Sequence, residues 1–268
     1  MILWSHNAYW FQGAPSLWGR ERQAAHPEAL AALTGLYASL GADVLLLQEV
    51  PDTSVAAALG EALDMHWHFV PGGERPDYGG GILWRRDLVG VVRDLTDCRT
   101  AAGRRFERIC MHLVLQMGAY ELSVINLHLS SNRFAPDGRG EAVRLGELAR
   151  VFDEVLSADA VAGDFNARPD SGVYDLMLGK GYRDPHDEPQ CKSHLEPHLE
   201  PHLESGAAAA AAAAITPQRI DYVWVDEKRL RSVPLGTPAP FVMPRHSDTA
   251  LSDHLPVGVE ITLAEQRQ

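Results

Sequence analysis

Apolar residues occur in short runs that alternate with longer stretches of amphipathic spacing, and this pattern predicts a mixed α/β chain. Runs rich in Val, Ile and Leu and bounded by Gly, Pro or polar residues are typical of strands. Such runs predict strands at residues 1–6, 42–50, 66–70, 80–84, 88–95, 106–117, 120–129, 158–162, 219–225 and 255–262. Helices are predicted at residues 21–40, 51–63, 140–156 and 173–178.

The two longest predicted strands are adjacent in the sequence. Only Gly118 and Ala119 separate residues 106–117 from residues 120–129, so these strands are predicted to form a hairpin and part of the sheet to be antiparallel. Strands and helices are mixed along the chain, and no linker separates two halves. We therefore expect one α/β domain over residues 1–268, with its sheets covered by helices.

A repetitive segment interrupts this pattern. The unit His-Leu-Glu-Pro recurs between His194 and Glu204, and eight alanines follow at residues 207–214. Proline at every fourth position forbids a continuous helix, and so repetitive a tract cannot specify a packed core. We expect a low-complexity surface insertion at about residues 190–215, whose histidines are solvated rather than bound to a metal.

The composition agrees with a globular protein. The chain is 46% apolar and 22% charged, and it has no run of 18 apolar residues that would predict a membrane span. The N-terminus lacks the basic and apolar regions of a secretory signal, so a cytoplasmic location is expected. Cys98, Cys110 and Cys191 show no CxxC spacing and are expected to be reduced thiols, and no protein partner is inferred.

The formal net charge of −12 bears on the substrate. Proteins that bind nucleic acid tightly and nonspecifically usually carry a basic face, which an acidic total disfavours. A local basic patch remains compatible with that total, and a bound divalent cation would make a site more positive. Charge therefore weakens a nuclease hypothesis without removing it.

Polar side chains stand where several apolar runs end. Any one of them could be a helix cap or a turn residue. Together they offer oxygen ligands for a hard divalent cation and donors for the oxygens of a phosphate. The set predicts a metal-dependent phosphoesterase, and it comprises Asn7, Glu49, His128, Asp164, Asn166, Asp253 and His254, with Asp221 predicted to lie inside its strand.

The motifs around these residues resemble the endonuclease/exonuclease/phosphatase superfamily. That group includes pancreatic-type deoxyribonucleases, abasic-site endonucleases, inositol-phosphate phosphatases and neutral sphingomyelinases. In the family's order they are Asn7, Gln48-Glu49, Asn126-Leu127-His128, Gly163-Asp164-Phe165-Asn166, Arg219-Ile220-Asp221-Tyr222 and Ser252-Asp253-His254-Leu255-Pro256. The resemblance implies a four-layer α/β/β/α sandwich, in which two packed, mostly antiparallel sheets are flanked by helices.

The resemblance also implies a Mg²⁺ or Mn²⁺ cofactor. Glu49 is then expected to be the central ligand, with Asn7 beside it and Asp253 completing the site. Asp164 is expected to orient or deprotonate the attacking water, and Asn166 to hold water or phosphate through its amide. The expected reaction is in-line attack of water on phosphorus without a covalent intermediate.

The remaining roles that the resemblance implies concern the two histidines. His254 is expected to contact the scissile phosphate, and Asp221 to bind its other ring nitrogen and fix its tautomer. His128 is expected to be a second donor to the phosphate. Glu107, in the stretch Arg105-Phe106-Glu107-Arg108, matches the position that steadies that histidine in deoxyribonuclease-like members.

The substrate is less well defined by the sequence. Tyr9 and Trp10 follow Asn7 and could stack on a base at the rim of the site, while core packing is the alternative. Arg133 and Arg139 lie in the loop after His128 and could contact phosphate or simply be solvated.

Three hypotheses follow. The first is a nuclease or nucleotide phosphodiesterase acting on DNA, RNA or a nucleotide, and the second is a phosphatase or phosphodiesterase acting on a small molecule or lipid headgroup. The third, a non-catalytic binding protein, predicts a lost catalytic residue, and none of the expected set is missing.

Overall fold

The computed structural model of the protein describes residues 1–134, 139–187, 219–239 and 241–264. The expected insertion at residues 190–215 lies outside the described residues, as does Cys191. Cys98 and Cys110 are free thiols. Within the described residues, no helix is both long and apolar enough to cross a membrane.

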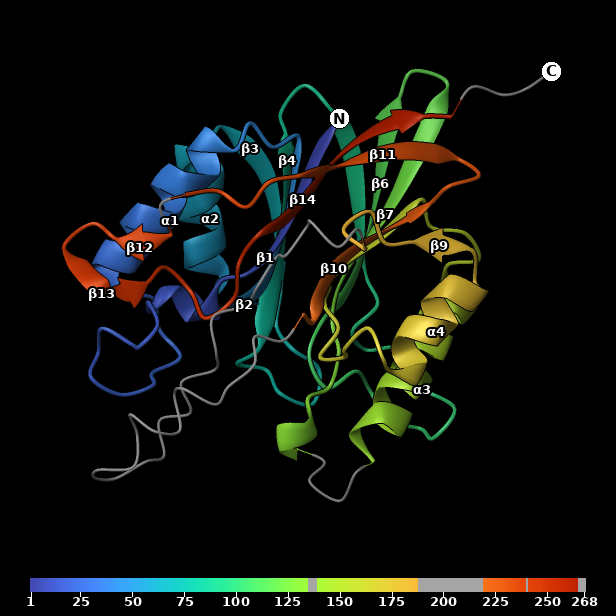
Figure 1. The fold of residues 1–268 in the computed structure, drawn as a ribbon, viewed down its shortest axis with the longest axis horizontal. Helices are drawn as coiled ribbons and strands as arrows, with labels where there is room; N and C mark the ends of the chain where they lie inside the picture. Colours follow the sequence, from blue (N-terminus) through green and yellow to red (C-terminus); the bar gives the residue numbers. More distant parts are fainter. Residues whose placement is uncertain (135–138, 188–218, 240, 265–268) are drawn as a thin grey trace.

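Two six-stranded sheets form the centre of the molecule (Figure 1). The first contains, in spatial order, β11 (Leu230–Leu235), β14 (Val257–Leu263), β1 (Ile2–Asn7), β2 (Val44–Val50), β4 (Gly79–Arg85) and β3 (Met65–Val70). The second contains β5 (Val89–Asp94), β6 (Cys110–Met117), β7 (Tyr120–His128), β8 (Ala160–Asp164), β10 (Asp221–Asp226) and β9 (Tyr182–Arg183). Each sheet is antiparallel except for one parallel pair, β1–β2 in the first and β7–β8 in the second.

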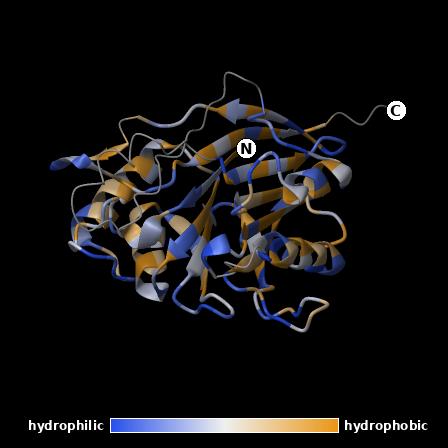
Figure 2. Ribbon diagram, turned by 60° about the horizontal axis from the view of Figure 1, so that its bottom comes forward, coloured by the Kyte–Doolittle hydropathy of each residue, from blue (hydrophilic) through white to orange (hydrophobic). Residues whose placement is uncertain are grey.

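Helices cover the outer face of each sheet, which gives the expected four-layer α/β/β/α sandwich (Figure 1). The first sheet packs against α1 (Pro27–Ser39) and α2 (Thr53–Ala62), and the second against α3 (Gly140–Glu154) and α4 (Gly172–Gly179). A small hairpin of β12 (Val242–Met243) and β13 (His246–Ala250) lies beside α1. The central strands are mostly orange in Figure 2, whereas the helices carry both colours, as expected for elements with one buried face.

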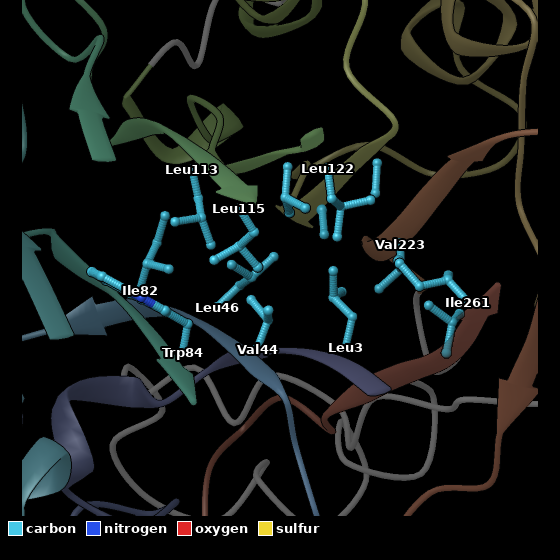
Figure 3. Close-up of a cluster of buried hydrophobic side chains, with 14 of the residues drawn as sticks. Leu3, Val44, Leu46, Ile82, Trp84, Leu113, Leu115, Leu122, Val223 and Ile261 are labelled. Carbon is cyan, nitrogen blue, oxygen red and sulfur yellow. The ribbon is translucent and has the colours of Figure 1, made fainter. Parts of the chain in front are cut away.

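The space between the sheets is filled by aliphatic side chains. Leu3 and Leu46 from the first sheet meet Leu113 and Val223 from the second, and all four are fully buried (Figure 3). Removal of this apolar surface from water is the main term that holds the layers together.

A polar bridge crosses the same interface near the ends of the strands. The side-chain amide of Gln48 donates to Asn126 Oδ1 at 2.7 Å, and Asn126 donates to the carbonyl oxygens of Leu47 and Gly81. Both side chains are fully buried. Gln48 and Asn126 belong to the motifs recognised in the sequence, and their contacts join the two sheets beneath the neighbouring Glu49 and His128.

Several predicted boundaries were wrong. The helix predicted at residues 21–40 begins at Pro27, because a proline has no N–H and its ring blocks the preceding helical turn. The strand predicted at residues 106–117 begins at Cys110, since the backbone of residues 106–108 bonds instead to the loop at residues 73–75. Asp221, predicted inside its strand, is the first residue of β10.

Candidate active site

The strand ends of both sheets bring the predicted side chains together. Because β1 and β2 are parallel, Asn7 and Glu49 lie at the same edge of the first sheet. In the second sheet His128 ends β7 and pairs in register with Asp164, which ends β8. Asn7 joins the two sets, because its amide donates to Asp164 Oδ2 at 3.1 Å.

Glu49 is turned into the site by a bulge in β2. Gln48 pairs with Gly80 and Val50 with Gly79, so Glu49 is an extra residue in the strand, and its φ is +54°. Its side chain is buried, and burial together with the neighbouring Asp253 raises the pKa of Glu49 to about 8. Two carboxylates are therefore held close together in a site with little access to water.

His254 and Asp221 form a buried pair across the two sheets. Nδ1 of His254 donates to Asp221 Oδ2 at 2.8 Å. Burial alone would lower the pKa of His254, but the carboxylates of Asp221 and Asp253 raise it well above its ordinary value. The imidazole is therefore charged at neutral pH, and its Nε2 lies 3.9 Å from an oxygen of Asp253 and 3.9 Å from an oxygen of Asp164.

Asp164 stands at the centre of these groups. Burial would raise the pKa of its carboxyl, but the hydrogen-bonding contact with His128 and the positive charges of His254 and Arg108 hold it below its ordinary value. The backbone N–H of Asn166 donates to Asp164 Oδ1 at 2.8 Å. The side-chain amide of Asn166 donates to the carbonyl oxygen of Leu129 at 3.0 Å, so this amide also ties the loop after β7 to the site.

Arg108 is a site residue that the sequence did not reveal. It is 4% exposed, and its guanidinium Nη1 lies 2.8 Å from His128 Nε2 and donates to the carbonyl oxygen of Leu129 at 2.7 Å. The same ring nitrogen lies 3.1 Å from Asp164 Oδ2, and burial with the charge of Arg108 lowers the pKa of His128 to about 4. In this arrangement His128 is neutral, and the positive charge belongs to Arg108.

The expected contact between Glu107 and His128 is not formed. His128 Nδ1 has no hydrogen-bond partner within the described part of the chain, and Nε2 is held by Arg108. Glu107 is buried, and its backbone N–H donates to Glu147 on α3 at 3.0 Å. Arg108, the next residue in the sequence, is therefore the one that contacts His128.

The four expected substrate residues occupy different positions. Tyr9 is half-buried and lies near Glu49 and Asp253. Burial raises the pKa of its hydroxyl well above the ordinary value, and the two carboxylates raise it further. Trp10 is not at the rim: it is 4% exposed, packs at 4.9 Å on the Tyr78 ring and donates its indole N–H to Asp77.

Both loop arginines are exposed. Arg133 lies in a short turn, η2 (Asn132–Phe134), and is near enough to Tyr78 to oppose the rise of that residue's pKa. Arg139 lies at the start of α3, where its carbonyl oxygen accepts from Val143.

Among the residues that the structure describes, two groups of side chains have the chemistry of a metal site. Asp164, Asp221 and His254 offer ligand atoms within 4.8 Å of one another, but His254 and Asp221 are already bonded to each other. Glu49 and Asp253 are carboxylates whose mutual repulsion a cation would relieve, and the oxygen of Asn7 is a further ligand of the type that Mg²⁺ and Mn²⁺ prefer. The donor set of Asn7, Glu49 and Asp253 therefore fits a hard divalent ion.

Solved structures with the same fold are numerous at low sequence identity. The human Nocturnin catalytic domain with bound sulfate is 17% identical, with a TM-score of 0.68 over 98% of this chain and 93% of that chain. Danio rerio TDP2 complexed with a single-strand DNA product is 16% identical, with a TM-score of 0.69 over 98% of both chains. A family protein from Bacteroides thetaiotaomicron is 17% identical, with a TM-score of 0.68 over 97% of both chains.

These identities establish the shared fold and no more. A search among curated proteins found no significant match. The sequence profile of the Endonuclease/Exonuclease/phosphatase family matches residues 5–254, which include every candidate site residue from Asn7 to His254. The chain therefore belongs to the endonuclease/exonuclease/phosphatase family.

Proposed function

We propose that this protein is a Mg²⁺- or Mn²⁺-dependent phosphodiesterase that cleaves a nucleic acid or a nucleotide by in-line attack of water. Members of the family are generally metal-dependent hydrolases. The observation that carries the proposal is the meeting of Glu49 and Asp253 with the charged His254 around Asp164. Phosphoryl transfer needs such a combination of oxygen ligands, a proton acceptor and cationic donors.

Asp164 is suited to orient the attacking water. Its carboxylate is ionised, because its pKa is held below the ordinary value, and it lies between Asn7 and the two histidines. A carboxylate so placed accepts a hydrogen bond from water and directs its lone pair toward phosphorus. Asn166 keeps this carboxylate in place through its backbone N–H.

His254 and Arg108 are suited to neutralise the phosphate oxygens. Nε2 of the charged His254 can donate to a non-bridging or leaving oxygen, and Asp221 keeps its other nitrogen occupied. Arg108 adds a fixed cation beside His128. Loss of one such donor typically costs about 100- to 1,000-fold in rate.

A divalent ion bound by Asn7, Glu49 and Asp253 would supply Lewis-acid stabilisation of the charge that builds on the phosphate. The proposed assignment leaves Asp164, Asp221 and His254 for proton handling. In-line attack then proceeds without a covalent intermediate on the protein.

The choice of a nucleic-acid or nucleotide substrate rests on two features. Relatives of the same fold were solved with a single-strand DNA product and with a sulfate anion. Tyr9 offers a partly exposed aromatic ring near the acidic pair, and Arg133 adds an exposed cation near Tyr78. The net charge of −12 favours the second candidate, an esterase for small phosphate esters or lipid headgroups.

The test is hydrolysis of a substrate panel with Mg²⁺, Mn²⁺ or a chelator. The panel contains single-stranded and duplex DNA, RNA, bis-p-nitrophenyl phosphate, inositol phosphates and sphingomyelin. We expect metal-dependent cleavage of a nucleic acid or of the diester, lost in Glu49→Gln and His254→Ala and retained in the surface control Asp226→Asn. Preferential turnover of inositol phosphates or sphingomyelin would select the second candidate, and no turnover with no metal binding would reject both.

A further inference from the structure

The end of β1 is tied to the loop that carries Asp253 and His254. Ser252 Oγ donates to the carbonyl oxygen of Asn7 at 2.7 Å, and the backbone N–H of His254 donates to Ser252 Oγ at 3.1 Å. A third bond comes from the imidazole of His6, whose Nε2 lies 3.0 Å from the carbonyl oxygen of His254. The loop that holds two of the site residues therefore takes its position from β1.

The hydrogen positions on His6 follow from its partners. A carbonyl oxygen can only accept, so Nε2 of His6 carries a hydrogen and donates it to His254. In the neutral ring Nδ1 is then an acceptor, and the hydroxyl of Tyr37, 2.7 Å away, donates to it. His6 is fully buried and Tyr37 is 3% exposed, so water does not compete for either bond.

These bonds form a continuous path from a helix to the site. Tyr37 stands on α1, and its ring contacts the edge of His6 with 5.8 Å between centroids. Phe241 packs on His6 in a similar edge-on manner at 5.7 Å. The ring of His6 is thus fixed in orientation as well as in tautomer.

We propose that His6, with Tyr37 behind it, is a positioning residue: it fixes the backbone at His254 so that the imidazole of His254 meets Asp221 across the gap between the sheets. The His254–Asp221 bond joins a loop of the first sheet to a strand of the second, so its geometry depends on where that loop is held. The catalytic consequence of this role rests on the proposed function, whereas the structural consequence does not.

Filling the space is not enough for this role. An apolar side chain in place of His6 would leave the carbonyl oxygen of His254 buried without its donor, and an unpaired buried acceptor is costly. The loop would then shift to find a partner, and shifts of about 1 Å near reacting groups can cost about 100-fold in rate.

The test uses the Nδ1 proton of His254, observed by NMR in the metal-free protein and assigned by its loss in His254→Gln. We expect His6→Leu to shift or broaden this resonance beyond detection, Tyr37→Phe to shift it less, and His6→Gln to retain it, because the glutamine amide can replace the Nε2 donor. Leu33→Ala, a cavity in the same α1 core, is the control for general loosening and should leave the resonance in place.

Kinetics provide the second readout wherever the wild-type protein turns over a substrate. We expect His6→Leu to lower kcat by about 10- to 100-fold with KM nearly unchanged, and His6→Gln to recover most of it. A wild-type resonance in His6→Leu would overturn the proposal, and so would an equal loss of it in Leu33→Ala. Should His6→Leu not fold, an unchanged resonance in Tyr37→Phe would overturn it instead. Absence of phosphoesterase activity in the wild type would reject the proposed function while leaving the resonance to decide the role of His6.

Discussion

Arg108 combines charge and geometry in a way that a lysine cannot reproduce. One nitrogen of its guanidinium contacts His128 and donates to the carbonyl oxygen of Leu129, and the planar group lies over the ring of Tyr78. We expect Arg108→Lys to lower kcat by about 100-fold, because the ammonium keeps the charge but not the planar group that contacts His128 and Leu129 together. The measurement is steady-state hydrolysis of the preferred substrate, beside thermal unfolding.

The matched control for this prediction is Arg93→Lys. Arg93 is an exposed arginine on β5 that pairs with Glu154, and exposed pairs contribute little. Equal losses of activity in the two variants would show that Arg108 has no special part in the reaction.

The sequence predicted candidate site residues that carry recognisable motifs, such as Glu49, Asp164 and His254, and the structure brings these side chains together. The sequence did not reveal Arg108, because a cation in the polar stretch at residues 104–108 resembles a solvated surface arginine. Only the fold shows that Arg108 is buried and that its backbone bonds to the loop at residues 73–75. The sequence left the place of Trp10 open between the rim of the site and the core, since its burial against Tyr78 depends on a contact far away in the chain.

At the scale of elements, the close approach of β8 to β7 depends on Gly163. Its φ is +141°, and a Cβ at this position would lie 1.8 Å from the carbonyl oxygen of Leu127. We expect Gly163→Ala to lower the free energy of unfolding by more than about 3 kcal/mol, because backbone strain adds to the clash. Denaturant unfolding measures this loss, and a stability equal to that of the wild type would contradict it.

Gly146→Ala is the control for that substitution. Gly146 lies within α3, and a Cβ there would meet no atom within 4 Å. The same chemical change should therefore stabilise the protein, by about 0.5–1 kcal/mol, since alanine favours helix over glycine.

Short continuous apolar runs predicted most of the strands, because a strand that is buried on both faces needs apolar side chains on both. β11 was not predicted, since it is an edge strand that carries Arg231, Ser232 and Pro234 and so lacks that surface. The turn at Tyr9–Phe11 was also missed, because three consecutive non-glycine residues with positive φ have no signal in the sequence.

Buried neutral histidines make the free energy of unfolding of the whole protein depend on pH in the acid range. Burial, with the charge of Arg219, lowers the pKa of His186 from 6.5 to about 4. The unfolded state therefore binds more protons between these two values, so stability is present above pH 6.5 and is lost as the pH falls toward 4. This one histidine should account for up to about 3 kcal/mol of the loss.

His186→Gln isolates that contribution. We expect the difference in unfolding free energy between wild type and variant, taken from urea titrations, to be constant above pH 7 and to shrink as the pH falls to 4. A difference that stays constant over the whole range would show that His186 has the same pKa in the folded and the unfolded state.

In the proposed assignment, the metal ligands and the two carboxylates that handle protons come from different sheets. The proposed metal ligands Asn7, Glu49 and Asp253 all belong to the first sheet and its loop, whereas Asp164 and Asp221 belong to the second. Glu49→Gln should weaken Mn²⁺ binding by more than about 100-fold. Substitutions of residues that only support the ligands cost at most about that much, so the loss of a ligand should cost more. Asp221→Asn should bind Mn²⁺ with an affinity within about tenfold of that of the wild type, although its activity falls, because Asp221 acts on His254 and not on the ion.

Isothermal calorimetry measures both affinities, and saturating Mn²⁺ should raise the Tm of wild type and Asp221→Asn but not of Glu49→Gln. The reverse order of affinities would place the ion among Asp164, Asp221 and His254, whose ligand atoms are also close enough to hold one.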